Sequence, residues 1–436
     1  MSLRLSPDLR LLVALGVWVG AAAASVVLPA LDWAVFLGGC VLASAAFVDA
    51  MSVRAGPGLA LERHAPARFE VGGETELEIS VHNPRRRAVV ADVYDELPND
   101  LAPEDPRFES VTLGPGETKT LTYRVMPRVR GDRALGPVAA LEHAPMGLVR
   151  RSVVAAAGQV VRVYPDTRRF LVPEALNPRK VLASLGVKPS RQRGEGTEFE
   201  SLRDYVLGDD PRRIDWRATA RRGRFVTRLL QHERNHTLMI ALDASRLMGG
   251  RLGAQRTKLD CAVDAALALA WSALHAGDRA GLVVFDRERR HFVEPVARRA
   301  HLGTFVEALA PVESRLVEAD YRVLARSLLG RRQRRSLVVV LTDFAESDAS
   351  ALTTPLALLA RRHQVLLVAL RDHRFDELEA QETDAYERIV LDDLLREREE
   401  TLARLRMQGV HTLDLVSDAV TAPVLNRYLA MRWGSL

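Results

Sequence analysis

Residues 194–230, here called the charged segment, hold the densest group of side chains able to do chemistry, because carboxylates alternate there with arginines. Paired carboxylates can perform acid–base catalysis, as in glycoside hydrolysis. Each carboxylate here has an arginine within a few residues, however, and a nearby guanidinium lowers a carboxyl pKa and keeps the group ionised. Planar guanidinium groups also hold carboxylates as a two-pronged clamp. We therefore predict a structural clamp or a partner-docking surface, with a hydrolase as the alternative. The residues of this prediction are Arg203, Asp204, Tyr205, Asp209, Asp210, Arg213, Asp215, Trp216 and Arg221.

Residues 232–236 spell HERNH, a literal match to the HExxH pattern of zinc peptidases. That chemistry needs both histidines one turn apart on a sustained helix. An unbroken apolar run, TLMIAL, follows at once in residues 237–242. Such a run predicts a strand, whose successive side chains alternate between faces. We therefore expect no zinc site at this position.

Two apolar runs end in aspartate. Residues 237–243 end at Asp243, which is followed by Ser245, and residues 336–344 contain Asp343. Near-continuous apolar runs are typical of strands buried on both faces of a parallel sheet. Strands and amphipathic helical patterns alternate from this point onward, which predicts an open, doubly wound α/β sheet with its functional crevice at the strand C-termini. The alternative is that both aspartates only cap neighbouring helices and loops.

Residues 52–165 show short alternating apolar runs broken by turns, which favours an antiparallel β-sandwich-like domain. Leu77, Ile79 and Val81 recur with a period of two and should share one buried face. The sequence indicates no catalytic cluster in this part of the chain.

Two runs without charge, residues 11–30 and 33–48, lie near the N-terminus. The first has the length needed to span a hydrocarbon core, and the second reaches it with flanking residues. A signal peptide is the competing interpretation of the first run, but a second run follows immediately. We therefore predict a hairpin of two transmembrane helices.

The charges around these runs predict their orientation. Arg4 and Arg10 precede the first run, Arg54 and Arg63 follow the second, and the turn between them carries only Asp32. By the positive-inside rule both ends face the cytoplasm. We therefore expect a multi-pass protein of the bacterial cytoplasmic membrane with its soluble domains on the cytoplasmic side.

The overall charge argues against nucleic acid as the partner. The formal net charge is +5 and the pI is about 9.4, but the basic residues are spread along the chain among acidic ones. A strand-binding groove would instead gather them into a stripe with aromatic residues. The two cysteines, Cys40 and Cys261, lack the spacing of a disulfide framework or a cysteine zinc site.

The string LRDYVLGDDPRRIDWRATAR, residues 202–221, resembles the signature of the family called domain of unknown function 58. In that family a two-helix anchor and a β domain precede the signature, which leads into a von Willebrand factor A-like domain. Its members are often encoded beside MoxR-type AAA+ ATPases and are thought to assist the assembly or activation of membrane or envelope complexes. The resemblance implies a non-enzymatic interaction or scaffold protein with such an ATPase as partner.

The strand ends also look like the metal-ion-dependent adhesion site of von Willebrand A domains, written Asp-x-Ser-x-Ser, a threonine and a later aspartate. Asp243, Ser245 and Asp343 match this pattern, which implies Mg²⁺ with one coordination position open to an acidic partner side chain. The second serine position is Leu247, and residues 317–321 contain no threonine. Either Glu318 or Asp320 supplies an oxygen, or the site no longer binds metal.

The sequence thus predicts four segments. They are a transmembrane hairpin (1–51), a β-sandwich-like domain (52–165), a linker with the charged segment (166–235) and a von Willebrand factor A-like domain (236–436). A protein-interaction module is the expected function, and a hydrolase or an envelope-facing adhesion protein are the alternatives. No phosphate-binding loop, dinucleotide fingerprint or nucleophile elbow occurs in the sequence.

Overall fold

The computed structural model describes residues 4–101, 107–155, 159–168, 198–206, 209–231, 236–252, 256–330, 335–345, 349–372, 385–416 and 420–433. The chain forms two compact units, Met1–Tyr164 and Pro165–Leu436, which are called the N-terminal and C-terminal units below. Each unit is described by itself.

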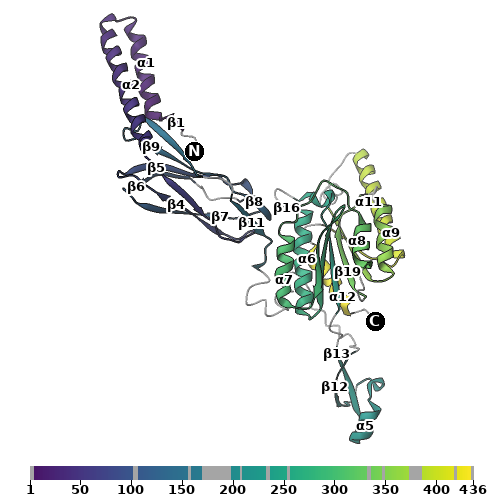
Figure 1. Cartoon of the computed structure of the whole chain (residues 1–436). Helices are drawn as coiled ribbons and strands as arrows, with labels where there is room; N and C mark the ends of the chain where they lie inside the picture. The colour runs from purple at the N-terminus through teal and green to yellow at the C-terminus, as the bar shows by residue number, and fades with distance from the viewer. Residues whose placement is uncertain are drawn as a thin grey trace. The chain divides into compact units, whose positions relative to one another are not determined.

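Two apolar helices form an antiparallel hairpin in the N-terminal unit (Figure 1). Helix α1 spans Leu9–Ser25 and α2 spans Asp32–Arg54, and a short 3₁₀ turn, Pro29–Leu31, joins them. The Trp18 indole donates to the carbonyl of Val35 over 2.9 Å and lies so close to Gly39 that a Cβ there would stand 2.9 Å from the ring. No residue of α1 is buried, so the hairpin exposes its apolar side chains.

The prediction of two transmembrane helices is supported for one helix only. Among the described residues, the segment Pro29–Arg54 is long and apolar enough to cross a membrane, whereas α1 has only 17 residues. A helix of that length spans roughly 26 Å, slightly less than a hydrocarbon core of about 30 Å. The first apolar run is cut short because the chain turns after Ser25 and Pro29, which has no N–H, opens the connecting turn. Helix α2 instead continues beyond the second run to Arg54.

The rest of the N-terminal unit is built from three β-sheets around one apolar core. The five-stranded antiparallel sheet has the order β1 (Arg4–Pro7), β10 (Val149–Val154), β9 (Val138–His143), β5 (Val89–Asp95) and β6 (Arg107–Leu113). A second antiparallel sheet orders β2 (Ala60–His64), β4 (Thr75–His82) and β7 (Thr118–Val125), and a third orders β3 (Phe69–Glu70), β11 (Val160–Tyr164) and β8 (Gly131–Ala134). Only β3 and β11 pair in parallel among the described strands of this unit.

The predicted buried face of β4 is confirmed, since Leu77, Ile79 and Val81 are all fully buried in the core between the sheets. Strand β1 was not predicted. It precedes the first apolar helix and pairs antiparallel with β10, with Arg4 opposite Ser152 and Pro7 opposite Val149.

Buried carboxylates join the apolar hairpin to the β-sheets. Asp49, near the end of α2, accepts hydrogen bonds from the backbone N–H groups of Met146 (2.9 Å) and Leu148 (2.8 Å). Asp8, just before α1, binds Arg150 on β10 through both carboxylate oxygens, at 2.6 and 3.1 Å. Because these contacts lie at the base of both helices, the hairpin is fixed to the sheets at two points.

The C-terminal unit is an open α/β sheet. Its strand order is β18 (Arg289–Val296), β17 (Arg279–Phe285), β14 (Thr237–Asp243), β19 (Leu337–Thr342), β20 (Gln364–Arg371) and β21 (His411–Val416). All neighbours run parallel except β18, which is antiparallel to β17. Strand β14 begins at Thr237 as predicted, while residues 232–235 of the HERNH run lie outside the described residues.

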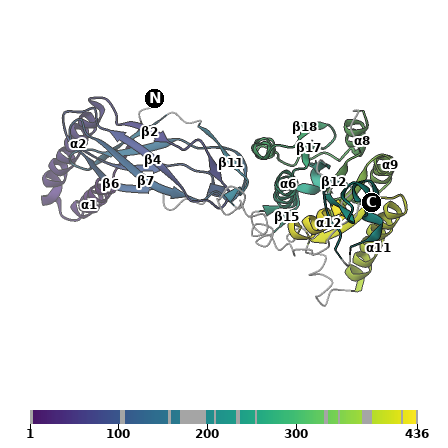
Figure 2. The ribbon, with the colours of Figure 1, turned by 90° about the horizontal axis from the view of Figure 1, so that it is seen from below.

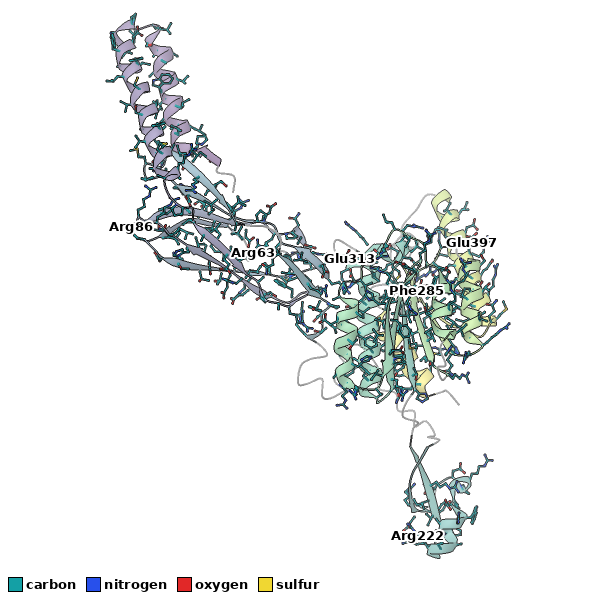
Figure 3. All side chains as sticks on the ribbon, in the orientation of Figure 1. Arg63, Arg86, Arg222, Phe285, Glu313 and Glu397 are labelled. Carbon is teal, nitrogen blue, oxygen red and sulfur yellow. The ribbon has the colours of Figure 1, made fainter. Side chains whose placement is uncertain are left out.

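Helices cover both faces of this sheet (Figures 1 and 2). Helices α6 (Lys258–His275), α7 (Leu302–Leu309) and α12 (Thr421–Trp433) pack together on one face. Helices α8 (Tyr321–Leu329), α9 (Ala349–Ala360) and α11 (Ala385–Met407) pack on the other. Phe285, at the end of β17, is fully buried inside this fold (Figure 3). The alternation of strands and helices follows the order expected from the sequence.

The charged segment forms a small hairpin of its own. Strands β12 (Glu198–Asp204) and β13 (Val226–Gln231) pair antiparallel, and the connection between them contains a 3₁₀ turn, Pro211–Arg213, and the short helix α5 (Trp216–Arg222). Gly223 ends α5 in a left-handed conformation (φ 66°), which a residue without a side chain adopts at little cost.

Candidate functional site

Asp243 and Asp343 lie next to each other at the C-terminal ends of β14 and β19. The two strands are adjacent and parallel, and Leu242 stands opposite Leu341, so Asp243 is level with Thr342 and Asp343 follows directly. From this point the chain order of the strands runs outward in both directions, which makes it the switch point of a doubly wound sheet. We call the residues gathered at these two strand ends the rim.

Asp243 is fully buried and satisfied by neutral donors. Its Oδ1 accepts from the Ser245 backbone N–H over 2.8 Å, and its Oδ2 accepts from the Thr342 hydroxyl over 2.6 Å. The Tyr321 hydroxyl lies 2.8 Å from the same Thr342 oxygen and completes a buried chain. Burial raises the pKa of Asp243 to about 7, and the nearby charge of Asp343 acts in the same direction.

Asp343 is paired with two cations. Lys258 Nζ, at the start of α6, lies 2.6 Å from its Oδ2, and Arg398 on α11 lies 3.0 Å from its Oδ1. Arg398 also binds Oδ1 of Asp414 on β21 at 3.0 Å, and its guanidinium stacks over the Phe344 ring at 4.6 Å. The Asp343 carboxylate thereby connects the end of β19 with helices α6 and α11, and Arg398 extends the connection to β21.

The donor set, as folded, does not suit a divalent ion. All four oxygens of Asp243 and Asp343 accept hydrogen bonds from protein donors: Ser245, Thr342, Phe344, Arg398 and Lys258. Mg²⁺ demands octahedral coordination by oxygen, and Leu247 contributes none at the second serine position. Within the described ranges no cluster of three or more His, Cys, Asp or Glu residues could hold a metal. Magnesium binding at Asp243, Ser245 and Asp343 therefore stays a prediction without structural support.

The two carboxylates considered as replacements for the missing threonine have other partners. Glu318 pairs with Arg246 at 2.9 Å on the surface, and Asp320 caps helix α8 by accepting from the Arg322 backbone N–H. The hydroxyl that contacts Asp243 comes instead from Thr342, the residue directly before Asp343. Sequence reasoning placed the missing hydroxyl in residues 317–321 because it followed the spacing of the adhesion-site pattern.

In the charged segment, arginines pair with three of the predicted carboxylates. Asp209 binds Arg203 at 2.5 Å, Asp204 binds Arg224 at 2.8 Å, and Asp215 binds Arg228 at 2.9 Å. Asp215 also caps α5, and the N–H groups of Ala218 and Arg217 together with Arg228 lower its pKa. Asp210 caps the 3₁₀ turn by accepting from the Arg212 N–H. These contacts are those of an ion-pair clamp.

The aromatic residues of this segment form an exposed cluster. The Phe225 ring makes edge contacts with Tyr205 (6.2 Å) and Trp216 (6.3 Å), and the Tyr205 hydroxyl donates to the Asp209 carbonyl. Trp216 is 66% exposed and Phe225 is 55% exposed. Arg221 is exposed beside them, and the side chain of Arg213 lies outside what the structure describes.

Three rim residues were missed by sequence reasoning: Lys258, Thr342 and Arg398. Two sequence features could have identified Lys258 and Thr342. The chain has four lysines among 61 basic residues, so a lysine at the start of a helix that faces the rim is unusual. Thr342 ends a strand beside a predicted ligand. Arg398 gave no signal, because it lies among many charged residues of α11.

Residues 201–404 match the family described as "Protein of unknown function DUF58". The matched region covers most of the charged segment and most of the α/β sheet. Uncharacterized proteins of Mycobacterium bovis and Mycobacterium tuberculosis are 29% identical over 187 residues, which is 42% of this chain. The chain spans 58% of the length of these relatives.

Two solved structures also match parts of the chain. A CARDB domain from Pyrococcus furiosus is 21% identical, covers 25% of this chain and 90% of its own, and has a TM-score of 0.17. A conserved hypothetical protein, BatB, from Bacteroides thetaiotaomicron is 13% identical, covers 45% of this chain and 98% of its own, and has a TM-score of 0.30.

Proposed function

We propose that this chain is a membrane-anchored, non-enzymatic interaction module, with a von Willebrand factor A-like C-terminal unit, that works with a MoxR-type AAA+ ATPase. Its role is to help assemble or activate a membrane or envelope complex. The class of partner follows from the family resemblance of residues 202–221, and the docking surface lies on the charged segment.

The observation that carries the proposal is an exposed surface of aromatic and arginine side chains, here called the α5 surface. Trp216 and Phe225 form its apolar part. The adjoining 3₁₀ turn and α5 carry exposed arginines for which the described residues provide no ion pair: Arg212, Arg217, Arg221 and Arg222. Arg222 is seen on α5 in Figure 3. Tryptophan and arginine are the residues most enriched among those that dominate protein–protein binding energy.

The charge of the α5 surface specifies the chemistry of its partner. Unpaired guanidinium groups around an apolar centre complement a partner surface with a hydrophobic pocket and a rim of Asp and Glu side chains. Asp209, Asp204 and Asp215 are already bound by Arg203, Arg224 and Arg228 respectively, so these three carboxylates do not neutralise the outer arginines.

The same pairing weakens the hydrolase alternative. A general acid at neutral pH needs a raised pKa, whereas the contacts of Asp215 lower its pKa. Asp204 and Asp209 each bind an arginine directly. With these carboxylates engaged by arginines, the segment is better suited to binding than to acid–base chemistry.

The apolar hairpin supports the anchor. Trp33 and Val17, 83% and 69% exposed, belong to helices whose apolar side chains face outward, and water-exposed apolar surface of this extent marks a membrane or protein contact. We propose that α1 and α2 cross the bacterial cytoplasmic membrane together and that both units face the cytoplasm, as the flanking arginines indicate.

The test is a crosslinking pull-down from native bacterial membranes with the full-length chain. We expect the wild-type chain to recover a MoxR-type ATPase. The Arg221→Glu/Arg222→Glu variant should recover at least about tenfold less, since reversing charges at an interface weakens docking and each 1.4 kcal/mol is a factor of ten.

The matched control is Arg298→Glu/Arg299→Glu, which reverses two adjacent exposed arginines elsewhere in the C-terminal unit. It changes net charge equally and should bind like the wild type. Recovery of the ATPase by all three proteins alike would refute the α5 surface as the docking site. Absence of any MoxR-type ATPase from the wild-type sample would refute the assigned partner.

A further inference from the structure

The rim contains a buried lysine whose position needs an explanation. Lys258 is 7% exposed, whereas Lys119, the other lysine that the structure describes, is on the surface. Arginine is the basic residue this chain uses almost everywhere, with only four lysines among 61 basic residues. The two side chains differ physically: lysine offers a compact point charge, and arginine a broad planar fork. This position in the fold therefore favours a compact cation.

Lys258 is held in place by its surroundings. It is the first residue of α6, whose start is fixed by a reciprocal capping box between Thr257 and Asp260. Its backbone N–H donates to the Gly250 carbonyl over 2.9 Å. A Cβ on Gly250 would stand 3.2 Å from Cε of Lys258, so the side chain passes closely over the loop that follows Asp243. The ammonium group is thus directed at the rim.

At the rim, the ammonium makes the contact that a metal ion would otherwise make. Nζ of Lys258 lies 2.6 Å from Oδ2 of Asp343, while Oδ1 is taken by Arg398 and the Phe344 N–H. A Mg²⁺ ion bound to Oδ2 would lie about 2 Å from that oxygen, and so no more than about 5 Å from the ammonium nitrogen. Two like charges at that distance in a buried site repel strongly. The lysine and the ion therefore exclude one another.

We propose that the Lys258 ammonium takes the place of the divalent cation at this rim, so that the site is assembled, and any partner is captured there, without a metal ion. The statement that a partner is captured at the rim rests on the proposed function. The replacement of the divalent cation by the Lys258 ammonium does not rest on it and is tested without a partner.

The experiment is a Mn²⁺ titration of the purified full-length chain in detergent, with free Mn²⁺ followed by electron paramagnetic resonance. The wild type should show no saturable binding up to about 1 mM, the weak end of protein divalent-ion sites. Its unfolding temperature should be equal in EDTA and in Mg²⁺. Lys258→Ser removes the ammonium and adds a hydroxyl, and it should gain saturable Mn²⁺ binding that Lys258→Ser/Asp343→Asn loses. Lys119→Ser is the matched control and should behave like the wild type.

Two results would overturn the proposal. One is saturable Mn²⁺ binding by the wild type that Asp343→Asn abolishes. The other is a folded Lys258→Ser variant that binds Mn²⁺ no better than the wild type. If Lys258→Ser unfolds in EDTA, Mn²⁺ must restore its folded circular-dichroism signal, and a failure of this rescue counts equally against the proposal. A missing ATPase in the pull-down would leave these metal titrations unchanged, so the two failures can be told apart.

Discussion

The two rim carboxylates, Asp243 and Asp343, differ in the charge of the groups that donate hydrogen bonds to them. Asp243 receives only neutral donors, from Ser245 and Thr342, whereas Asp343 receives two cations, Lys258 and Arg398. Two adjacent carboxylates cannot both be ionised cheaply in a buried site. The rim resolves this by concentrating positive charge on Asp343 and leaving Asp243 with a pKa raised to about 7 by burial.

A first prediction concerns the hydroxyl between them. Thr342→Val removes the donor to Asp243 and the hydrogen-bond partner of Tyr321 while keeping the shape of the side chain. Leaving a buried polar group without its partner costs about 1–3 kcal/mol, and we expect the free energy of unfolding to fall by that amount. Chemical denaturation followed by circular dichroism measures it. Tyr321→Phe, which leaves the Thr342–Asp243 bond intact, should cost less. A Thr342→Val variant as stable as the wild type would contradict the buried chain.

These residue-scale contacts were only partly predictable. Asp243 and Asp343 could be placed together because parallel strands end at a common edge. Thr342 and Lys258 could be singled out by strand position and by the rarity of lysine, but their hydrogen-bond partners could not be predicted, because the partner of a side chain depends on the loop and helix packed above it. The adhesion-site pattern directed attention to residues 317–321, and Glu318 and Asp320 there bind other groups.

Among the elements, strands and helices with a strong apolar period were predictable. Strands and helices alternate after Asp243 as the patterns predicted, and the face of β4 is buried as its alternation indicated. Elements without such a pattern were missed. Strand β1 is four residues long and its sequence, RLSP, has no strand signal. It exists because β10 offers an open edge, and pairing of that kind is decided by the tertiary structure.

A second prediction tests the join between the apolar hairpin and the sheets. Asp49→Ala removes both backbone hydrogen bonds to Met146 and Leu148, and hydrogen bonds to charged groups contribute about 1.5–3 kcal/mol each. We expect the unfolding temperature of the N-terminal unit to fall and the loop around Met146 to become accessible to proteases. Asp32→Ala, in the exposed turn of the hairpin, is the control and should change neither. Equal proteolysis of the two variants would show that the join is weak.

For the whole molecule, the β1–β10 pairing restricts topology. Because β1 precedes α1 and β10 follows α2, a hairpin inserted in a membrane must return the chain to the side from which it left if this sheet is to form. This restriction does not depend on arginine counts. The requirement that both ends of the hairpin lie on one side of the membrane is also satisfied if the hairpin enters the bilayer without fully crossing it. The short length of α1 is compatible with such a partial insertion.

A third prediction follows for the full-length chain in sealed membrane vesicles. One tag with a protease cleavage site is placed before Arg4, and another in the turn between β6 and β7. Protease added outside the vesicles should cleave both tags in one vesicle orientation and neither tag in the opposite orientation. Immunoblotting of the two tags measures this. Opposite accessibility would be incompatible with the pairing of Arg4 with Ser152, whichever side faces the cytoplasm.

The same strand pairing bears on how the protein is made. Asp8 and Arg150, which bind each other at the base of the hairpin, are 142 positions apart. At a synthesis rate of 5–20 residues per second, the partner edge leaves the ribosome roughly 7 to 30 s after the first strand. During that interval the two apolar helices have already emerged, while β1 is still unpaired. Closure of the five-stranded sheet is therefore a late step in building the N-terminal unit, followed by the addition of β11 to the third sheet. A nascent chain stalled before β10 would carry its apolar hairpin without a complete five-stranded sheet.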